Sequence, residues 1–269
     1  MTRSKKRVIA SRLFANMMTI AICVPAIYGP GIVHAQSSTK SKPNKQGSST
    51  KMSTTLSSQL EEQAGKSRSR MPAPMLDTFQ KGIESVRATG IESKAKQVGD
   101  IAIDTQLLGW DGESVTLSDL WKKGPVVLMW YRGGWCPYCN IQLRAMQQSL
   151  DQLNGAGATL VVLTPELPEK AKATAAANDL SMVALHDKDS ALAKQYGIVF
   201  RLPEAIVPVY RDRLKLPEFN GNDAMELPLS ATYVINQEGK ITYAFLDADY
   251  KKRAEPAEVV EAVKQASAM

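Results

Sequence analysis

The sequence is poor in the two side chains that most often bind transition metals in proteins. Only two histidines and three cysteines occur among 269 residues, and beyond residue 35 a single histidine, His186, accompanies two cysteines. A structural zinc site needs four ligands of the Cys or His type. The sequence also lacks a Ser-His-Asp pattern for hydrolysis, a glycine-rich phosphate loop and paired metal-ligand motifs. Zinc binding and histidine-dependent hydrolysis are therefore disfavoured.

An electrostatic footprint for nucleic acids is also missing, although the formal net charge is +6. Residues 1–70 contain 12 Lys or Arg against 2 Asp or Glu, whereas the rest of the chain contains 21 against 25. The basic excess is confined to the N-terminal stretch, and the remainder is mildly acidic. Because phosphate backbones require a basic patch on the folded domain, we expect no nucleic-acid partner.

The sequence also lacks a long unbroken apolar run near its N-terminus. Basic residues precede an apolar stretch that Asn16, Pro25 and Pro30 interrupt, whereas a spanning helix needs about 20 apolar residues. This order is typical of a secretory signal, and residues 33–35 (VHA) supply small residues for a signal peptidase. We expect residues 1–35 to be cleaved, which leaves an exported, periplasmic or extracellular protein without stable membrane insertion. An uncleaved membrane anchor is the alternative.

Three segments of different composition follow the predicted signal peptide. Residues 36–54 are mostly Ser, Thr, Lys and Gln, which cannot bury enough surface to become ordered, so we expect a flexible tether. Residues 55–98 carry apolar side chains at three- and four-residue spacing, which predicts a helical extension that packs on the following domain. Residues 99–269 form the predicted main domain.

The main domain alternates short apolar runs with helical patterns. Residues 125–131 and 158–163 are rich in β-branched residues and predict two buried strands, with a helix between them that ends at residues 154–155. Such a strand-helix-strand unit requires a parallel pair of strands. Further elements are predicted as helices over 168–177, 190–196 and 256–266, a strand over 182–185 and a hairpin of 232–236 with 240–246. The expected fold class is α/β, a mixed central sheet with helices on both faces.

The strongest chemical signal is the segment GGWCPYC at residues 133–139, between the first buried strand and its helix. Cys136 begins that helix, where the helix dipole and free N–H groups favour the nucleophilic thiolate. Cys139 lies three residues further, on the same side of the first turn, so its sulfur can reach Cys136. We predict that Cys136 attacks a substrate and that Cys139 resolves the product as a redox-active disulfide.

Non-catalytic interpretations of the pair compete with this one. Zinc binding lacks ligands, as described above. A structural disulfide suits an exported protein, although so short a loop adds little stability. Buried, inert thiols are disfavoured, because we expect Gly133 and Gly134 to give solvent close access to the turn.

Neighbouring side chains are secondary candidates. Arg132 is a candidate to stabilise the Cys136 thiolate or a bound oxyanion, with a solvated surface arginine as the alternative. Trp135 and Tyr138 would shield the thiol or contact a partner, unless they are ordinary half-buried aromatic residues. Asp187 ends a predicted strand before a helix, a position typical of a helix cap.

Residues 130–140 (WYRGGWCPYCN) closely resemble the peroxiredoxin-like branch of the alkyl hydroperoxide reductase and thiol-specific antioxidant (AhpC/TSA) superfamily. The resemblance extends over roughly residues 99–265 and includes the segments 185–187 (LHD) and 231–239 (ATYVINQEG). It implies a thioredoxin-like three-layer α/β/α sandwich and cysteine-based reduction of peroxides or disulfides, with a thioredoxin-like protein or a small thiol as reductant. No organic or metal cofactor is implied, because the two sulfurs carry the electrons.

Two positions depart from the pattern of this family. Typical peroxiredoxins place Thr or Ser three residues before the peroxidatic cysteine, where this chain has Gly133. Ser230 stands where typical peroxiredoxins have an arginine and thioredoxins a cis-proline. Negative charge that develops on the leaving oxygen of a peroxide must then be stabilised by Arg132, backbone N–H groups or water. We therefore expect only modest peroxidase activity.

The sequence is compatible with three functions. The first is a thiol-dependent antioxidant peroxidase that cycles through a disulfide between Cys136 and Cys139. The second is a thiol-disulfide exchange oxidoreductase that acts on protein or small-molecule disulfides. The third is a non-enzymatic exported binding domain in which the pair is a structural disulfide.

Overall fold

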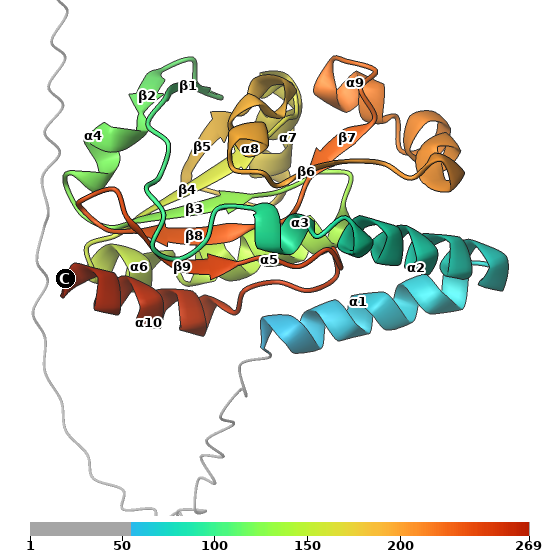
Figure 1. The fold of residues 1–269 in the computed structure, drawn as a ribbon, viewed down its shortest axis with the longest axis horizontal. Helices are drawn as coiled ribbons and strands as arrows, with labels where there is room; N and C mark the ends of the chain where they lie inside the picture. Colours follow the sequence, from blue (N-terminus) through green and yellow to red (C-terminus); the bar gives the residue numbers. More distant parts are fainter. Residues whose placement is uncertain (1–54, 269) are drawn as a thin grey trace, which may run out of the picture. The chain divides into compact units, whose positions relative to one another are not determined.

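The computed structural model of the protein describes residues 55–268. The predicted signal peptide (1–35) and tether (36–54) lie outside the described residues, so both stay predictions. A seven-stranded sheet lies at the centre of the described part, in the order β2-β1-β5-β4-β3-β8-β9 (Figure 1). Its strands are β1 (Gln106–Gly109), β2 (Ser114–Thr116), β3 (Val126–Trp130), β4 (Thr159–Thr164), β5 (Val183–His186), β8 (Thr232–Ile235) and β9 (Ile241–Phe245).

Parallel and antiparallel pairs both occur in this sheet. Strand β4 pairs in parallel with β3 and β5, whereas β8 runs antiparallel to both β3 and β9, and β1 runs antiparallel to both β2 and β5. The predicted mixed central sheet is therefore confirmed. A separate two-stranded sheet pairs β6 (Val199–Arg201) with β7 (Glu226–Pro228).

Helices occupy most of the connections between strands. They are α1 (Leu56–Arg70), α2 (Ala73–Ala88), α3 (Ile91–Lys94), α4 (Leu117–Trp121), α5 (Pro137–Gln148), α6 (Leu150–Gly155), α7 (Pro168–Ala177), α8 (Ala191–Gln195), α9 (Leu216–Asn220), α10 (Pro256–Ser267) and a short π-helix, η3 (Val209–Arg213). The helix predicted after the cysteines is divided into α5 and α6, because the backbone at Ser149 leaves the helical region. No helix within residues 55–268 is long and apolar enough to cross a bilayer.

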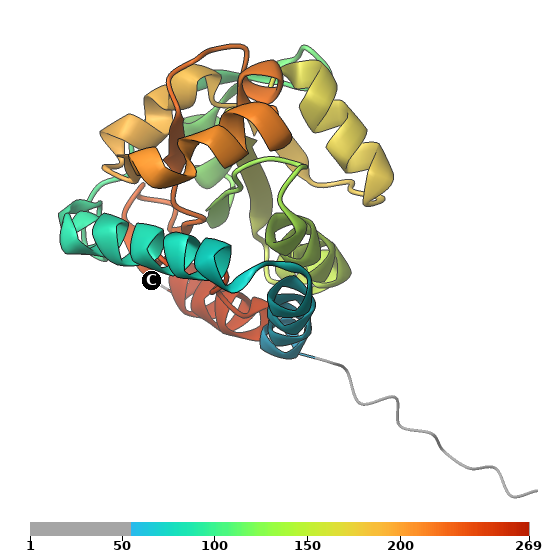
Figure 2. The same cartoon turned by 90° about the vertical axis from the view of Figure 1, so that its right-hand side faces the viewer.

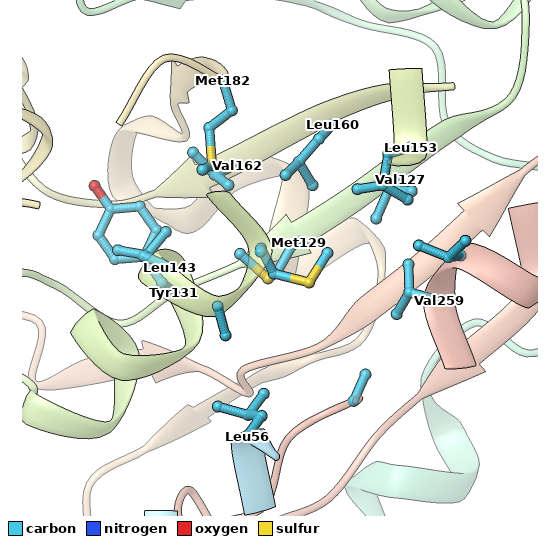
Figure 3. Packing of buried hydrophobic residues seen from close by; sticks show 14 of the residues in the cluster. Leu56, Val127, Met129, Tyr131, Leu143, Leu153, Leu160, Val162, Met182 and Val259 are labelled. Atoms are coloured by element: carbon cyan, nitrogen blue, oxygen red, sulfur yellow. The ribbon is translucent and has the colours of Figure 1, made fainter. Parts of the chain in front are cut away.

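Two hydrophobic clusters lie on opposite faces of the sheet. Val127 and Met129 of β3 belong to one cluster, and Leu128 and Trp130 of the same strand belong to the other, as the two-residue period of a strand requires. The first cluster is covered by α1, α5 and α10, which lie on the same side of the sheet in Figure 2, and Figure 3 shows its packing. The second cluster is covered by α3, α4 and α8. The three layers of the predicted sandwich are thus present.

A buried carboxylate connects the sheet to the second helical layer. Asp187 follows β5 and is fully buried. Its oxygens accept hydrogen bonds from Trp130 Nε1 (3.0 Å) and from the backbone N–H groups of Leu192 (2.8 Å) and Ala193 (3.0 Å). Asp187 therefore caps α8, which confirms the helix-cap interpretation.

The N-terminal helices pack on the main domain. Leu56 and Leu60 of α1 are buried in the first cluster. The carboxylate of Glu255, at the start of α10, accepts hydrogen bonds from the backbone N–H groups of Leu56 (3.2 Å) and Ser57 (2.6 Å). A carboxylate at a helix N-terminus accepts hydrogen bonds from N–H groups that have no partner within the helix. Its negative charge also interacts favourably with the positive end of the helix dipole. Packing and charge together fix the beginning of α1 against α10.

Candidate active site

The two cysteines lie where β3 leads into α5. Cys136 is the N-cap residue of α5, with an extended backbone (φ −93°, ψ 111°), and Pro137 occupies the first helical position. The N–H of Cys136 donates to the carbonyl of Gly133 (3.0 Å), which closes a tight turn ahead of the helix. Proline is suited to this position because the first N–H groups of a helix have no partner within it. Cys139 follows in the first turn of α5.

Glycines are required in this turn because other side chains fill the space around it. Gly133 has a φ of +148°, and a Cβ there would overlap the indole Nε1 of Trp135. A Cβ on Gly134 would overlap the Thr174 hydroxyl. The threonine or serine that typical peroxiredoxins carry at position 133 therefore does not fit this turn.

Both cysteines are buried, so the expectation that the two glycines give solvent close access to the thiols is wrong. The exposed fraction of Cys136 is 1% and that of Cys139 is 0%, and both are free thiols. Aromatic rings and a guanidinium close the site, since Arg132 stacks on Tyr250 at 4.2 Å and on Trp135 at 5.3 Å from the ring centroids.

Each sulfur has an arginine of its own. Arg132 is 3% exposed, and its Nη2 donates to Cys136 Sγ (3.2 Å) while its Nη1 donates to the hydroxyl of Tyr210 (3.2 Å). Arg253 is also buried, and its Nη2 donates to Cys139 Sγ at 3.6 Å. The alternative of a solvated surface arginine at position 132 is therefore wrong. Guanidinium groups beside buried sulfurs favour their thiolate forms.

Arg253 was not among the candidates from the sequence. It ends the segment DYKKR (residues 249–253), whose basic residues give no local signal that one side chain turns inward. Its Nη1 donates to the carbonyls of Tyr250 and Lys252, which holds the guanidinium in place. The contact between Arg253 and Cys139 joins residues 114 positions apart, so only the fold reveals it.

The two buried thiols influence each other's pKa. Burial raises the pKa of the Cys136 thiol well above its usual value, and a hydrogen bond with Cys139 raises it further. Burial acts the same way on Cys139, but the hydrogen bond with Cys136 and the charges of Arg253 and Arg132 lower the pKa of Cys139 well below its usual value. The two thiols titrate as one coupled pair, and the charges of Arg132 and Arg253 lower the pKa of both.

A cavity of about 620 Å³ opens beside Cys136. Cys136, Pro137 and Tyr138 line it, and Cys139 does not. Of the two cysteines, Cys136 is therefore the one that a molecule in the cavity can contact. In residues 55–268 no group of three or more His, Cys, Asp and Glu side chains is arranged to hold a metal ion.

A second residue that the sequence did not indicate is Glu166, in the loop after β4. Its carboxylate is fully buried and accepts a hydrogen bond from the N–H of Gly134 (2.8 Å), which holds the turn before Cys136. Burial raises the pKa of Glu166 to about 7, against the opposing effect of the Gly134 N–H, and negative charge on Cys139 raises it further. Ser230, buried between β7 and β8, is the position of the second departure from the family pattern.

The raised pKa of Glu166 predicts a pH dependence of stability. Between pH 4.5 and 7 the folded protein keeps a proton that the unfolded chain releases, so this residue makes the free energy of unfolding fall as the pH rises. We expect unfolding by urea, in the reduced protein, to cost about 2 to 3 kcal/mol less at pH 8 than at pH 5 through this group. Glu166→Gln should remove that part of the slope.

The exposed Glu169 offers a matched control for this measurement. Glu169→Gln should leave the slope of stability against pH unchanged. Equal slopes for Glu166→Gln and the unmodified protein would contradict the assignment of a raised pKa to Glu166.

The chain is similar to proteins named peroxiredoxins. Peroxiredoxin Bcp of Escherichia coli K12 is 29% identical over 102 residues, which cover 38% of this chain and 65% of that protein. The chloroplastic peroxiredoxin Q of Triticum aestivum is 25% identical over 158 residues, which cover 59% of this chain and 63% of that protein. The matches therefore span less than two thirds of the length of either relative.

A solved structure and a family model extend the comparison. The crystal structure of peroxidoxin BcpB from Mycobacterium tuberculosis superposes with a TM-score of 0.50 at 20% identity, covering 64% of this chain and 97% of that one, which indicates a shared fold. The model of the AhpC/TSA family matches residues 98–244, from the segment before β1 into β9. Because this match covers more than half of the 269 residues, the chain belongs to the AhpC/TSA family.

Proposed function

We propose that this protein is a thiol-dependent peroxidase that reduces hydroperoxides through Cys136 and Cys139. The observation that carries the proposal is the position of Cys136, which lines the cavity. Its Sγ accepts a hydrogen bond from Arg132 and lies within hydrogen-bond range of Cys139. Membership of the AhpC/TSA family and likeness to proteins named peroxiredoxins support the same chemistry.

The first chemical step forms a sulfenic acid. The sulfur of Cys136, as the thiolate, attacks the terminal oxygen of the hydroperoxide. The O–O bond breaks, the Cys136 sulfur becomes S–OH, and the leaving oxygen takes a proton to give an alcohol or water. Arg132, 3.2 Å from the sulfur, is placed to stabilise charge on the leaving oxygen.

The second step uses the other cysteine. The sulfur of Cys139 attacks the sulfur of the Cys136 sulfenic acid, and the hydroxyl leaves as water. The balance over both steps is two thiols and one hydroperoxide giving one disulfide, one alcohol and one water. A thioredoxin-like protein or a small thiol is the proposed reductant that returns the disulfide to two thiols.

Thiol-disulfide exchange is the second candidate, since a CxxC pair at a helix N-terminus also suits that reaction. The burial of both sulfurs weighs against exchange with a protein disulfide, because the attacking sulfur must be reached by a second folded surface. Export after cleavage of residues 1–35 is likewise a proposal, and it rests on the sequence alone.

Cysteine variants separate the possible functions. With reduced protein and hydrogen peroxide we expect two thiols to be lost per peroxide, and Cys136→Ser should slow this loss by more than about 10³-fold, because it removes the nucleophile. Cys139→Ser should still react and accumulate a sulfenic acid on Cys136, which dimedone labelling and mass spectrometry detect. Thiol loss with a disulfide substrate but not with peroxide would favour exchange, and loss with neither would favour a structural disulfide.

The role of Arg132 is tested by Arg132→Met, which keeps the length of the side chain and removes its charge and donors. We expect the rate of peroxide reduction to fall by about 10²-fold, the effect of losing one donor to a developing oxyanion. Stopped-flow measurement of thiol loss provides the rate. Arg201→Met, at an exposed position of β6, is the control, and equal rates for the two variants would exclude the proposed role.

The proposed export predicts which residue begins the mature protein. When the full chain is expressed in a bacterial host, N-terminal sequencing of the mature protein should give Gln36 as its first residue. Protein that retains Met1 and sediments with the membrane would instead support the uncleaved anchor.

A further inference from the structure

The helical extension forms one wall of the cavity beside Cys136. Helices α1 and α2 lie outside residues 98–244, the part that matches the AhpC/TSA family. The lining residues that these helices and the turn between them contribute are Ala64, Ser67, Arg68, Met71, Met75, Leu76, Asp77, Phe79 and Gln80. The family region by itself therefore leaves this side of Cys136 without a wall.

The wall is held firmly against the family region. Leu60 of α1 is buried in the first hydrophobic cluster, and Ser67 of the same helix accepts a hydrogen bond from the hydroxyl of Tyr138 (3.4 Å). Ile83 and Val86 of α2 are buried as well. Both helices are thus packed against the family region, and Figure 2 shows α1 alongside α5 and α10.

The size and chemistry of the cavity point to an organic ligand. A volume of about 620 Å³ lies within the range of sites for small organic molecules and far exceeds the space that hydrogen peroxide needs. Apolar and aromatic side chains make up much of its lining, from α2, from η3 and from the turn before α5: Met75, Leu76, Phe79, Trp135, Val209 and Tyr210.

The charged groups around the cavity are mostly positive. Arg68, Arg213 and Lys251 line it, and Asp77 is the one acidic lining residue, paired with Lys81 on the outer side of α2. Within residues 55–268 neither Arg68 nor Arg213 forms an ion pair with a carboxylate, and Arg213 Nη1 donates to Met75 Sδ at 3.9 Å. An apolar cavity with cationic groups at its border complements a molecule that has an apolar chain and an anionic head group.

We propose that the α1–α2 extension selects the substrate: it provides the apolar wall along which a hydroperoxide with a long apolar chain lies, while Arg68 and Arg213 bind its anionic head group. Met75 and Phe79 are then specificity-determining residues. The inference rests on the proposed peroxidase function, because the reaction at Cys136 is the one described above and converts such a hydroperoxide to its alcohol with one water and one disulfide.

The proposed selection is tested by comparing the reaction rates of two substrates. Reduced protein is mixed with hydrogen peroxide or with linoleic acid hydroperoxide, and the rate of thiol loss is followed by stopped flow. In Met75→Glu a carboxylate replaces part of the apolar wall and lies beside Arg213, whose Nη1 contacts Met75 Sδ at 3.9 Å, so we expect the ratio of the two rates, lipid over hydrogen peroxide, to fall by about tenfold or more. Ser85→Glu places the same charge at an exposed position of α2 outside the cavity and should leave the ratio unchanged.

The head group is tested with the methyl ester of the same hydroperoxide. Arg213→Met should lower the rate for the acid and not for the uncharged ester. An unchanged ratio in Met75→Glu, or equal losses for acid and ester in Arg213→Met, would overturn the proposed selection while leaving the peroxidase function intact.

A binding measurement separates failure of the inference from failure of the proposed function. Cys136→Ser does not react, so titration calorimetry with linoleate reports binding alone. We expect binding to Cys136→Ser, weakened by added Met75→Glu and unaffected by added Ser85→Glu. Binding without any peroxide reduction by the unmodified protein would overturn the peroxidase function and keep the ligand site, whereas absence of binding would overturn the site.

Discussion

The contact between two buried sulfurs and two buried guanidinium groups is the interaction on which this site depends. Arg132 lies 3.2 Å from the sulfur of Cys136, and Arg253 lies 3.6 Å from that of Cys139. A thiolate without such partners would be too costly to form away from water. Negative charge on the reduced pair is therefore balanced inside the protein, because the charges of Arg132 and Arg253 lower the pKa of both thiols.

The turn that places Arg132 beside Cys136 is also where the chain departs from the family pattern. The turn at Gly133 is filled by Trp135, so the hydroxyl of typical peroxiredoxins has no room. Trp135 in turn stacks on Arg132, whose guanidinium reaches Cys136 from the loop before α5 rather than from position 230. The loss of one polar group and the gain of an aromatic shield are thus two consequences of one rearranged turn.

The N-terminal extension belongs to this site as much as to the packing of the domain. Glu255 fixes the start of α1, and Tyr138, the residue before Cys139, donates to Ser67 near its end. An extension that only covered an apolar face would need neither polar contact. Both contacts join residues far apart in the sequence, so the cavity wall is a product of the tertiary structure.

Local patterns in the sequence predicted strands β3, β4, β5, β8 and β9, the place of the cysteines between β3 and α5, and the cap at Asp187, because each depends on neighbours within a few residues. The short strands β1, β2, β6 and β7 had no such local pattern and were not predicted. Tertiary structure decided how deeply the sulfurs are buried, which of them lines the cavity, and the parts played by Arg253 and Glu166. Those properties arise from contacts across more than 30 residues, such as Gly134 with Glu166 and Cys139 with Arg253. Burial and electric fields depend on what surrounds a group in space, and a local sequence pattern does not contain that information.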